Sequence, residues 1–311
     1  MRAARRWDGA GIFSDVKAYD YLVGKKFLSG EKVISLPLSC STLLAADLPL
    51  AAQLRVISQA GFPLVNLDPV GFLASYMDAD ANLNLLRHML DDFNLGIDWI
   101  HAPFRTINLY SDDREIRFAS LASLSFMVEQ AAMLGGRVLI VHCLPDEITP
   151  GYETPAGRNR LIEAFFHLSD RAQKYKIHVA TENLLEEKSH DLIEQILADV
   201  PGLYFCLDTG HAEITKTWDR WLPRYGARLT ALHIHDNRGQ EDEHLIPGDG
   251  IIDWVAFRKR MAAISYQGTW GMETVLHHNG QEESARAAAR RAYAAIASIY
   301  GDYSSAQRGT K

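Results

Sequence analysis

The feature that most constrains the fold is a regular alternation of short apolar runs and longer helical patterns along the chain. Eight runs have the length and composition of buried strands, and a helical pattern follows each of them. The strand-like runs cover residues 33–38, 64–67, 97–100, 138–141, 177–181, 203–207, 229–235 and 269–272. The helical segments cover residues 48–60, 82–93, 113–134, 156–175, 190–200, 218–225, 253–263 and 282–300.

Eight strand–helix units without a linker or a change in composition favour one α/β fold, a closed (β/α)8 TIM barrel, over an open doubly wound sheet. No Gly-rich phosphate loop follows the first strand-like run, which weakens the nucleotide-binding alternative. We therefore predict a single barrel domain (33–300) between an irregular N-terminal arm (1–32) and a polar, frayed C-terminal tail (301–311).

Composition narrows the classes of partner. The net charge of -7 and the pI of about 5.9 argue against a protein that binds duplex nucleic acid, which needs a basic face. No apolar run reaches the roughly 18 residues that span a bilayer, and no apolar segment follows the basic start of the chain as in a secretory signal. Three cysteines in or beside apolar strands fit buried thiols in a reducing compartment. We expect a cytoplasmic protein without membrane or nucleic-acid partners, whose N-terminal arm could cross to a neighbour in a homo-oligomer.

Six strand-like runs end in a side chain that can bind a metal ion, namely His101, His142, Glu182, Asp208, His233 and Glu273. In a barrel of parallel strands all these ends meet at one mouth. Each residue alone is weak evidence, because a histidine in this place is more often a packed residue and a carboxylate more often a helix cap. Together they predict a site for Zn²⁺, Mn²⁺ or Mg²⁺, which accept imidazole nitrogen and carboxylate oxygen.

Three further residues in the loops of the same mouth, His211, Asp242 and His244, are candidates for additional metal ligands. The alternative is that they only orient the ligands proper. His233 and His235 share one strand face, since side chains alternate along a strand. We take the deeper His233 as the ligand and His235 as a substrate contact or a support for the ligands.

Two residues that follow His101, namely Phe104 and Arg105, complete the candidate substrate site with His101 and His235. Arg105 could bind a carboxylate or a phosphate, or it could be a solvated loop residue.

The motifs that join these positions occur in the order of a known family. They are His101-Ala-Pro-Phe104, Val141-His142, Thr181-Glu182-Asn183, Leu207-Asp208-Thr-Gly-His211, His233-Ile-His-Asp236, Asp242-Glu-His244, Pro247-Gly-Asp-Gly250 and Met272-Glu273. Over residues 33–299 the chain resembles the xylose-isomerase-like barrel superfamily. That group holds sugar-phosphate and ketose isomerases and epimerases, inosose dehydratases, and abasic-site endonucleases of the endonuclease IV type.

The resemblance implies a role for each matched position. Glu182, Asp208, His233 and Glu273 match the four-ligand divalent metal site of the superfamily, and Glu182 and Glu273 match the pair that moves the proton next to the carbonyl in the epimerases. The positions that match additional zinc ligands of the endonuclease type are His101, His142, His211, Asp242 and His244. The arginine that helps bind substrate in ketose 3-epimerases has no secure counterpart here, which puts that subfamily in doubt.

Two functions follow from the resemblance. The first is a metal-dependent isomerase or epimerase, or a related carbohydrate lyase, that stabilises an enediolate of a free sugar, a sugar phosphate or a cyclic polyol. The alternative is a zinc phosphodiesterase that cleaves DNA at abasic sites. The acidic loops, including residues 112–113, 186–187 and 241–243, favour the carbohydrate substrate. A barrel that binds sugar without catalysis is disfavoured, because the ligand set is intact.

Overall fold

The structure is a computed structural model that describes residues 36–68, 80–145 and 148–309. The predicted N-terminal arm, the beginning of the first expected strand and residues 310–311 lie outside this part of the chain. None of the helices in the described residues combines the length and the hydropathy needed to span a membrane.

Eight parallel strands form the sheet, in the order β7-β6-β5-β4-β3-β2-β1-β8. Their bounds are β1 (Leu38–Ser41), β2 (Leu64–Leu67), β3 (Gly96–His101), β4 (Val138–Ile140), β5 (His178–Glu182), β6 (Tyr204–Asp208), β7 (Leu229–His233) and β8 (Trp270–Met272). The two ends of this order meet where Ile234 bridges to Met272, with Ile234 N donating to Gly271 O at 2.8 Å and Glu273 N donating to Ile234 O at 3.0 Å. The predicted (β/α)8 barrel is confirmed.

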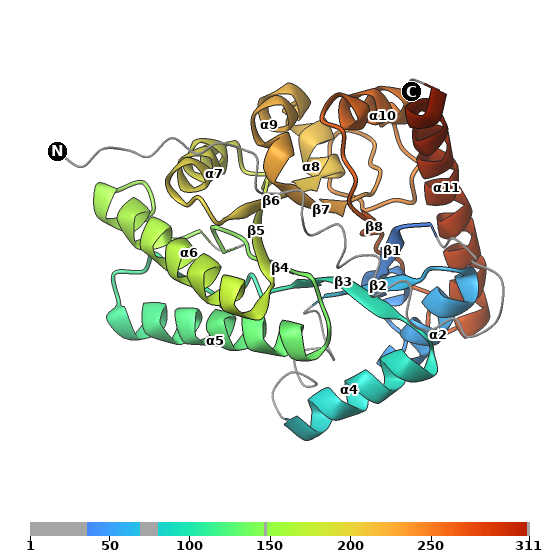
Figure 1. Ribbon diagram of the computed structural model, residues 1–311, viewed down its shortest axis with the longest axis horizontal. Helices are drawn as coiled ribbons and strands as arrows, with labels where there is room; N and C mark the ends of the chain where they lie inside the picture. Colours follow the sequence, from blue (N-terminus) through green and yellow to red (C-terminus); the bar gives the residue numbers. More distant parts are fainter. Residues whose placement is uncertain (1–35, 69–79, 146–147, 310–311) are drawn as a thin grey trace. The chain divides into compact units, whose positions relative to one another are not determined.

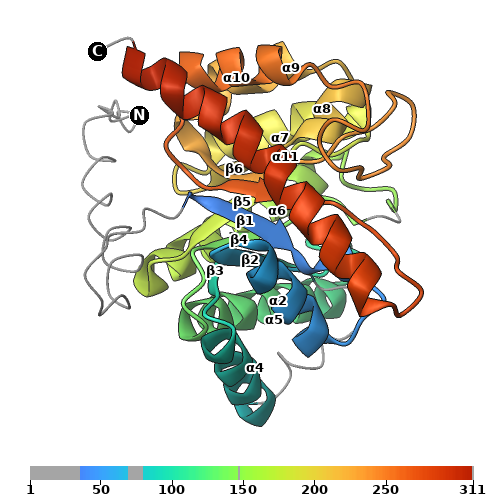
Figure 2. The ribbon, with the colours of Figure 1, turned by 90° about the vertical axis from the view of Figure 1, so that its right-hand side faces the viewer.

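Helices alternate with these strands and surround them (Figure 1). Their bounds are α2 (Leu50–Ala60), α4 (Asp80–Asp92), α5 (Arg114–Met133), α6 (Pro155–Tyr175), α7 (Glu187–Asp199), α8 (Thr209–Ile214), α9 (Trp218–Tyr225), α10 (Trp254–Ala263) and α11 (Glu282–Gly309), with 3-10 turns η2 (Thr42–Ala45) and η3 (Gly226–Arg228). Helix α11 packs against α2 and α10, and Figure 2 shows it lying across the outside of the strands.

The helix ends follow from the local sequence. Asp113 caps α5 through its side chain, which accepts a hydrogen bond from Glu115 N at 2.7 Å. Asp253 caps α10 in the same way through Val255 N and Ala256 N, both at 2.9 Å. These two caps fix where the helices begin, close to the predicted boundaries.

Two layers of apolar side chains make the core. Inside the barrel lie Trp99, Val138, Ile140, Ala180, Cys206 and Ala231, all fully buried. A larger cluster fills the space between the strands and the helices. Because strand side chains alternate, Val138 and Ile140 belong to the inner layer whereas Leu139 belongs to the outer layer. Packed side chains therefore fill the barrel interior beneath the mouth.

Strand β1 covers Leu38–Ser41, so it continues past residue 38, where the apolar run predicts its end. Two serines of this strand point into the barrel, and these polar residues do not match the apolar pattern from which strands are predicted. Ser39 Oγ donates to Asp98 Oδ2 at 3.1 Å, and Ser41 Oγ donates to the carboxylate of Asp68. Each buried hydroxyl group therefore has a carboxylate as its hydrogen-bond acceptor, which offsets the free-energy cost of burying it.

The C-terminal tail differs from its prediction as well. Helix α11 continues to Gly309, where we expected a frayed segment after residue 300. Tyr303 explains the extension, because it is buried, its hydroxyl donates to Tyr266 O at 2.6 Å, and its ring lies 5.1 Å from that of Trp270.

Candidate metal centre

The strand ends bring the predicted ligands to one level of the barrel mouth. Glu182 ends β5, Asp208 ends β6 and His233 ends β7, while Glu273 follows β8. The register pairs Asp208 with His233 across β6 and β7. Strands of one barrel therefore carry these four side chains to the same place, although they lie far apart along the chain.

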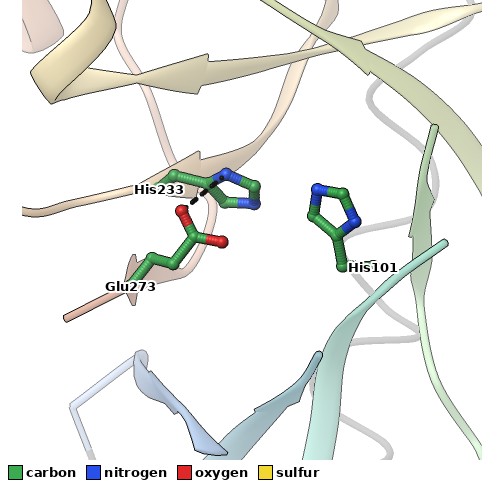
Figure 3. A group of neighbouring side chains, drawn as sticks. All are labelled: His101, His233 and Glu273. Carbon is green, nitrogen blue, oxygen red and sulfur yellow. Dashed lines mark ion pairs between the residues drawn. The ribbon is translucent and has the colours of Figure 1, made fainter. Parts of the chain in front are cut away.

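His233 is the centre of the four predicted ligands. Its Nδ1 lies 3.1 Å from Glu273 Oε2, 3.2 Å from Glu182 Oε2 and 3.9 Å from Asp208 Oδ2. All four residues are at most 6 % exposed. Figure 3 shows His233 and Glu273 in contact and His101 facing them from β3. Three carboxylates around one imidazole nitrogen form a set of donors suited to one divalent cation.

The contacts of His233 fit a cation better than hydrogen bonds. Both of its ring nitrogens are buried, and within the described residues neither has a hydrogen-bond partner of acceptable alignment. Asp242 Oδ1 is also buried and, among the described residues, has no hydrogen-bond partner. Burying a polar atom without a hydrogen-bond partner costs free energy. Nitrogen and oxygen atoms that lie close together without hydrogen-bond alignment therefore indicate a site for a metal ion between them. The residues present therefore fit a metal ion.

A second group lies on the β3 and β4 side of the mouth. His142 Nε2 is 3.2 Å from Glu182 Oε2 and 3.1 Å from His101 Nε2. The Nδ1–H of His101 donates to the carbonyl oxygen of Ala102 at 2.7 Å, which leaves Nε2 as the ring nitrogen with a lone pair. Because His101 and His142 present nitrogens to the same carboxylate, the structure joins both candidates to the central group.

A third group joins His211 of α8 to Asp242 and His244 on the loop after β7. Asp242 Oδ2 is 3.1 Å from His211 Nε2 and 3.0 Å from His244 Nε2. The other ring nitrogen of His211 donates to Asn183 O at 2.8 Å, and that of His244 donates to Glu273 O at 2.8 Å. Backbone carbonyl oxygens thus orient both imidazoles so that Nε2 faces the carboxylate, the arrangement found at metal-binding histidines.

Asp236 holds this loop in place. Its carboxylate accepts hydrogen bonds from Gly248 N at 2.8 Å, Ile252 N at 3.1 Å and Trp254 Nε1 at 3.1 Å. A Cβ on Gly250 would lie 2.2 Å from Asp236 Oδ1, so only glycine fits there. The Pro-Gly-Asp-Gly segment therefore serves to wrap the loop around Asp236, which positions Asp242 and His244.

The carboxylates and the imidazoles of the site carry opposite charges when ionised, and each kind shifts the pKa of the other. Burial raises the pKa of Glu182, but the neighbouring imidazoles, His233 foremost, hold it well below the usual range. Burial acts the same way on Glu273, yet His233 lowers its pKa to about 2. Burial lowers the pKa of His244, whereas Asp242 and Glu273 raise it to about 10. Without a cation, imidazolium groups balance the carboxylates, and a divalent ion would take over that role by displacing protons.

The mouth contains a cavity of about 310 Å³. Its lining includes the candidate donors and one aromatic ring, namely His101, Phe104, His142, Glu182, His211, His233, Asp242, His244 and Glu273. The apolar wall of the cavity consists of Leu43, Leu144, Pro145, Leu184, Leu185 and Val275. The volume lies at the low end of the range for small-molecule sites. A lining that combines metal donors with apolar side chains can hold one small polar molecule against a cation.

Two of the predicted substrate contacts, His235 and Arg105, do not line the cavity. His235 is fully buried, does not line the cavity, and contacts Asp208 Oδ2 through Nε2 at 2.9 Å. This contact with the Asp208 carboxylate fits the alternative in which His235 supports a ligand. Arg105 is exposed and does not line the cavity; its guanidinium carbon lies 6.0 Å from the ring centroid of Phe104.

Asp68 lines the cavity and was missed by the sequence analysis. It directly follows β2 and is 3 % exposed. The rule that selected the other strand ends would have found it, had it been applied to the strand of residues 64–67. A single carboxylate after a strand is a weak signal for a functional site, so the position of Asp68 in the cavity lining is what identifies it.

The fold and the cluster define a class, the TIM barrels with a candidate metal centre at the carboxyl ends of the strands. The family model described as a xylose isomerase-like TIM barrel matches residues 54–295. The chain belongs to that family, and the predicted resemblance is confirmed.

Relatives in this family have varied names. An uncharacterized protein, y4fM, of Sinorhizobium fredii is 28% identical over 282 residues, which cover 79% of this chain and 89% of that protein. A D-psicose 3-epimerase of Enterocloster bolteae is 21% identical over 72% of this chain and 76% of its own length. A probable endonuclease 4 of Mycobacterium ulcerans is 27% identical over 50% of this chain and 64% of its own length.

Among solved structures, an L-ribulose 3-epimerase superimposes with a TM-score of 0.72 at 16% identity, covering 88% of this chain and 97% of that one. A D-tagatose 3-epimerase-like protein gives a TM-score of 0.71 at 19% identity, covering 86% and 98%. At this identity the likeness establishes the common fold.

Proposed function

We propose that this protein is a sugar isomerase or epimerase that depends on a divalent metal ion and works by proton transfer next to a carbonyl group. The observation that carries the proposal is the contact of Glu182 and Glu273 with the same nitrogen of His233, at 3.2 and 3.1 Å, in a cavity for one small molecule. The epimerase names among the relatives and the solved structures support the same class.

Glu182, Asp208, His233 and Glu273 would hold the ion, which we take to be Mn²⁺, Zn²⁺ or Mg²⁺. When bound, such an ion acts as a Lewis acid that polarises a carbonyl and stabilises negative charge developing on its oxygen. His101, His142, His211, Asp242 and His244 would then orient these ligands or hold a further ion.

Glu182 and Glu273 would move the proton. The imidazoles around them hold the pKa of each carboxyl group below the usual range, which favours the ionised form that acts as a base. One carboxylate, ionised, would remove a proton from the carbon next to the carbonyl. The other, after taking up a proton from solvent, would give that proton to the opposite face, and proton exchange with water would restore both groups. Two bases on one substrate invert a stereocentre, whereas one base that serves two carbons moves the carbonyl.

The remaining lining would position the sugar. The carbon face of a sugar would pack on Phe104 and on the apolar wall, while His101 lies where it could contact a hydroxyl group. The apolar side chains would also keep bulk water from the exchanging proton.

The proposal is tested by proton exchange and metal content together. The purified protein, loaded with Mn²⁺, is incubated with D-psicose, D-tagatose or L-ribulose in deuterated water. We expect deuterium at the carbon next to the carbonyl and a product epimer or isomer. A loaded protein that exchanges no such proton in any ketose or aldose of a broad panel would exclude this chemistry.

A zinc phosphodiesterase acting on abasic DNA is the second candidate. It is supported by the five further ligand candidates gathered at the mouth and by the relative named as a probable endonuclease 4. The lining opposes it, because the described residues around the cavity include five carboxylates and neither lysine nor arginine. Two or three zinc ions per chain with cleavage of abasic DNA would favour this candidate, and one exchangeable ion would favour the isomerase.

A further inference from the structure

Asp68 is a buried carboxylate of the cavity that the proposed proton transfer leaves without a role. It lies at the end of β2, is 3 % exposed, and lines the cavity together with His101 and Glu273. Ser41 Oγ donates to its Oδ2, and Asp68 N donates to Thr42 Oγ1 at 3.5 Å. The neighbouring strand β1 and turn η2 therefore hold Asp68 in a fixed orientation.

Asp68 stands apart from the candidate metal ligands. Five groups of side chains in the described part of the chain have donor atoms within 4.8 Å of one another, and Asp68 belongs to none of them. It also makes no ion pair with a lysine or arginine among the residues that the structure describes. A carboxylate has about four acceptor sites, and Ser41 fills one of them.

A buried carboxylate with open acceptor sites needs donors from the molecule that enters the cavity. Hydroxyl groups of a polyol supply such donors without adding charge. A phosphate group would bring only negative charge to a lining that already holds Asp68, Glu182, Glu186, Asp242 and Glu273, with no lysine or arginine among the lining residues described. Burial and the charge of Glu273 raise the pKa of Asp68 to about 6, so a further negative group beside it would be unfavourable.

We propose that Asp68 is a specificity-determining residue that accepts hydrogen bonds from hydroxyl groups of an uncharged polyol substrate, so that the site excludes phosphorylated sugars. This inference rests on the proposed function for the reaction, but its binding step can be tested without turnover. It assigns the β2 side of the cavity to the hydroxyl-bearing part of the sugar, away from the reacting carbonyl.

The test compares Asp68→Asn with Glu187→Gln, which removes the same charge from an exposed carboxylate that does not line the cavity. Binding of D-psicose, D-tagatose, L-ribulose and D-fructose 6-phosphate to the Mn²⁺-loaded proteins is measured by calorimetry. Mn²⁺ affinity is measured separately by electron paramagnetic resonance. Where turnover is found, KM and kcat are measured as well.

We expect the wild type to bind at least one neutral ketose and to bind the phosphate ester more weakly. Asp68→Asn should weaken neutral ketose binding, and raise any KM, by about 10- to 100-fold, since it removes charge-assisted hydrogen bonds. Its discrimination against the phosphate ester should shrink, and its Mn²⁺ affinity should stay near that of the wild type. Glu187→Gln should change ketose binding by less than about 5-fold, because exposed charges contribute little.

Three results would overturn the inference: tighter binding of the phosphate ester than of every neutral ketose by the wild type, unchanged ketose binding in Asp68→Asn, or loss of Mn²⁺ in that variant. Tighter binding of an amino sugar than of its neutral parent would also overturn it, because the carboxylate would then select a cation. Ketose binding that depends on Asp68 in a protein without proton exchange would uphold this inference while the proposed reaction fails.

Discussion

The imidazole of His235 lies directly behind Asp208, with Nε2 at 2.9 Å from Oδ2 and 3.1 Å from Oδ1 of that carboxylate. Both residues are fully buried, and the His235 ring stacks on that of His244 with centroids 4.0 Å apart. The pair fixes the orientation of Asp208 toward the centre of the barrel mouth.

The first prediction follows from this pair. His235→Ala should weaken Mn²⁺ or Zn²⁺ binding by about 10- to 100-fold, because groups that orient a metal ligand have effects of that size. Metal affinity is measured by calorimetry on folded protein, with circular dichroism as the check on folding. Unchanged metal affinity with a raised KM would instead identify His235 as a substrate contact.

The second prediction concerns the proton carriers. Glu273→Gln should lower kcat by about 10²- to 10⁴-fold, because the amide cannot accept the proton. The similar size of the two side chains should preserve the fold. Loss of kcat is measured by deuterium exchange at saturating metal. A variant that retains wild-type exchange would remove Glu273 from the mechanism, and an unfolded one would show a structural role; Glu273→Asp is the second variant for that case.

The third prediction is that metal binding stabilises the fold. A ligand that binds only the folded state adds about 2.7 kcal/mol when its concentration is 100 times its Kd. The melting temperature of chelator-treated protein should therefore rise on addition of Mn²⁺ or Zn²⁺. The control is Asp208→Asn with His233→Gln, in which the rise should disappear. An equal rise in that double variant would locate the stabilising ion elsewhere.

The fourth prediction is the pH dependence of the metal-free protein. The pKa of Glu273 falls from 4.5 to about 2, so its contribution to the free energy of unfolding is present above pH 4.5 and is lost as pH falls toward 2. The pKa of His244 rises from 6.5 to about 10, so its contribution is present below pH 6.5 and is lost as pH rises toward 10.

Denaturant unfolding at a series of pH values should therefore find the metal-free protein most stable between about pH 4.5 and 6.5. Glu273→Gln should flatten the acid side, and His244→Gln the alkaline side. An unchanged profile in both variants would contradict the ion pairs between these imidazoles and carboxylates.

The fifth prediction concerns the loop around Asp236. Gly250→Ala should destabilise the protein by roughly 1–3 kcal/mol and weaken metal binding, because its Cβ would overlap the carboxylate that anchors the loop. Gly301→Ala is the matched control, since no atom lies within 4 Å of its added Cβ and it sits within α11. We expect that control to stabilise the helix by about 0.5–1 kcal/mol. Equal effects of the two changes would refute the packing around Asp236.

The sequence by itself determined the barrel and most of the candidate ligands. Alternating strand and helix patterns require parallel strands, and parallel strands that close into a barrel bring their carboxyl ends together. His101, Glu182, Asp208, His233 and Glu273 follow apolar runs, so their convergence could be inferred without coordinates. Local patterns also placed the starts of the helices near residues 113 and 253, where the structure shows the Asp113 and Asp253 caps, which act within one turn.

Only the tertiary structure decided which of these side chains face the cavity. His235 lies two residues beyond the end of β7 and contacts Asp208, whereas His233 ends that strand at the centre of the cluster. Asp68 and Ser41 satisfy each other across β1 and β2, a contact between strands that no local pattern encodes. The burial of a side chain and its hydrogen-bond partners depend on residues from distant parts of the chain. The periodicity of the sequence depends only on residues that are close together along the chain.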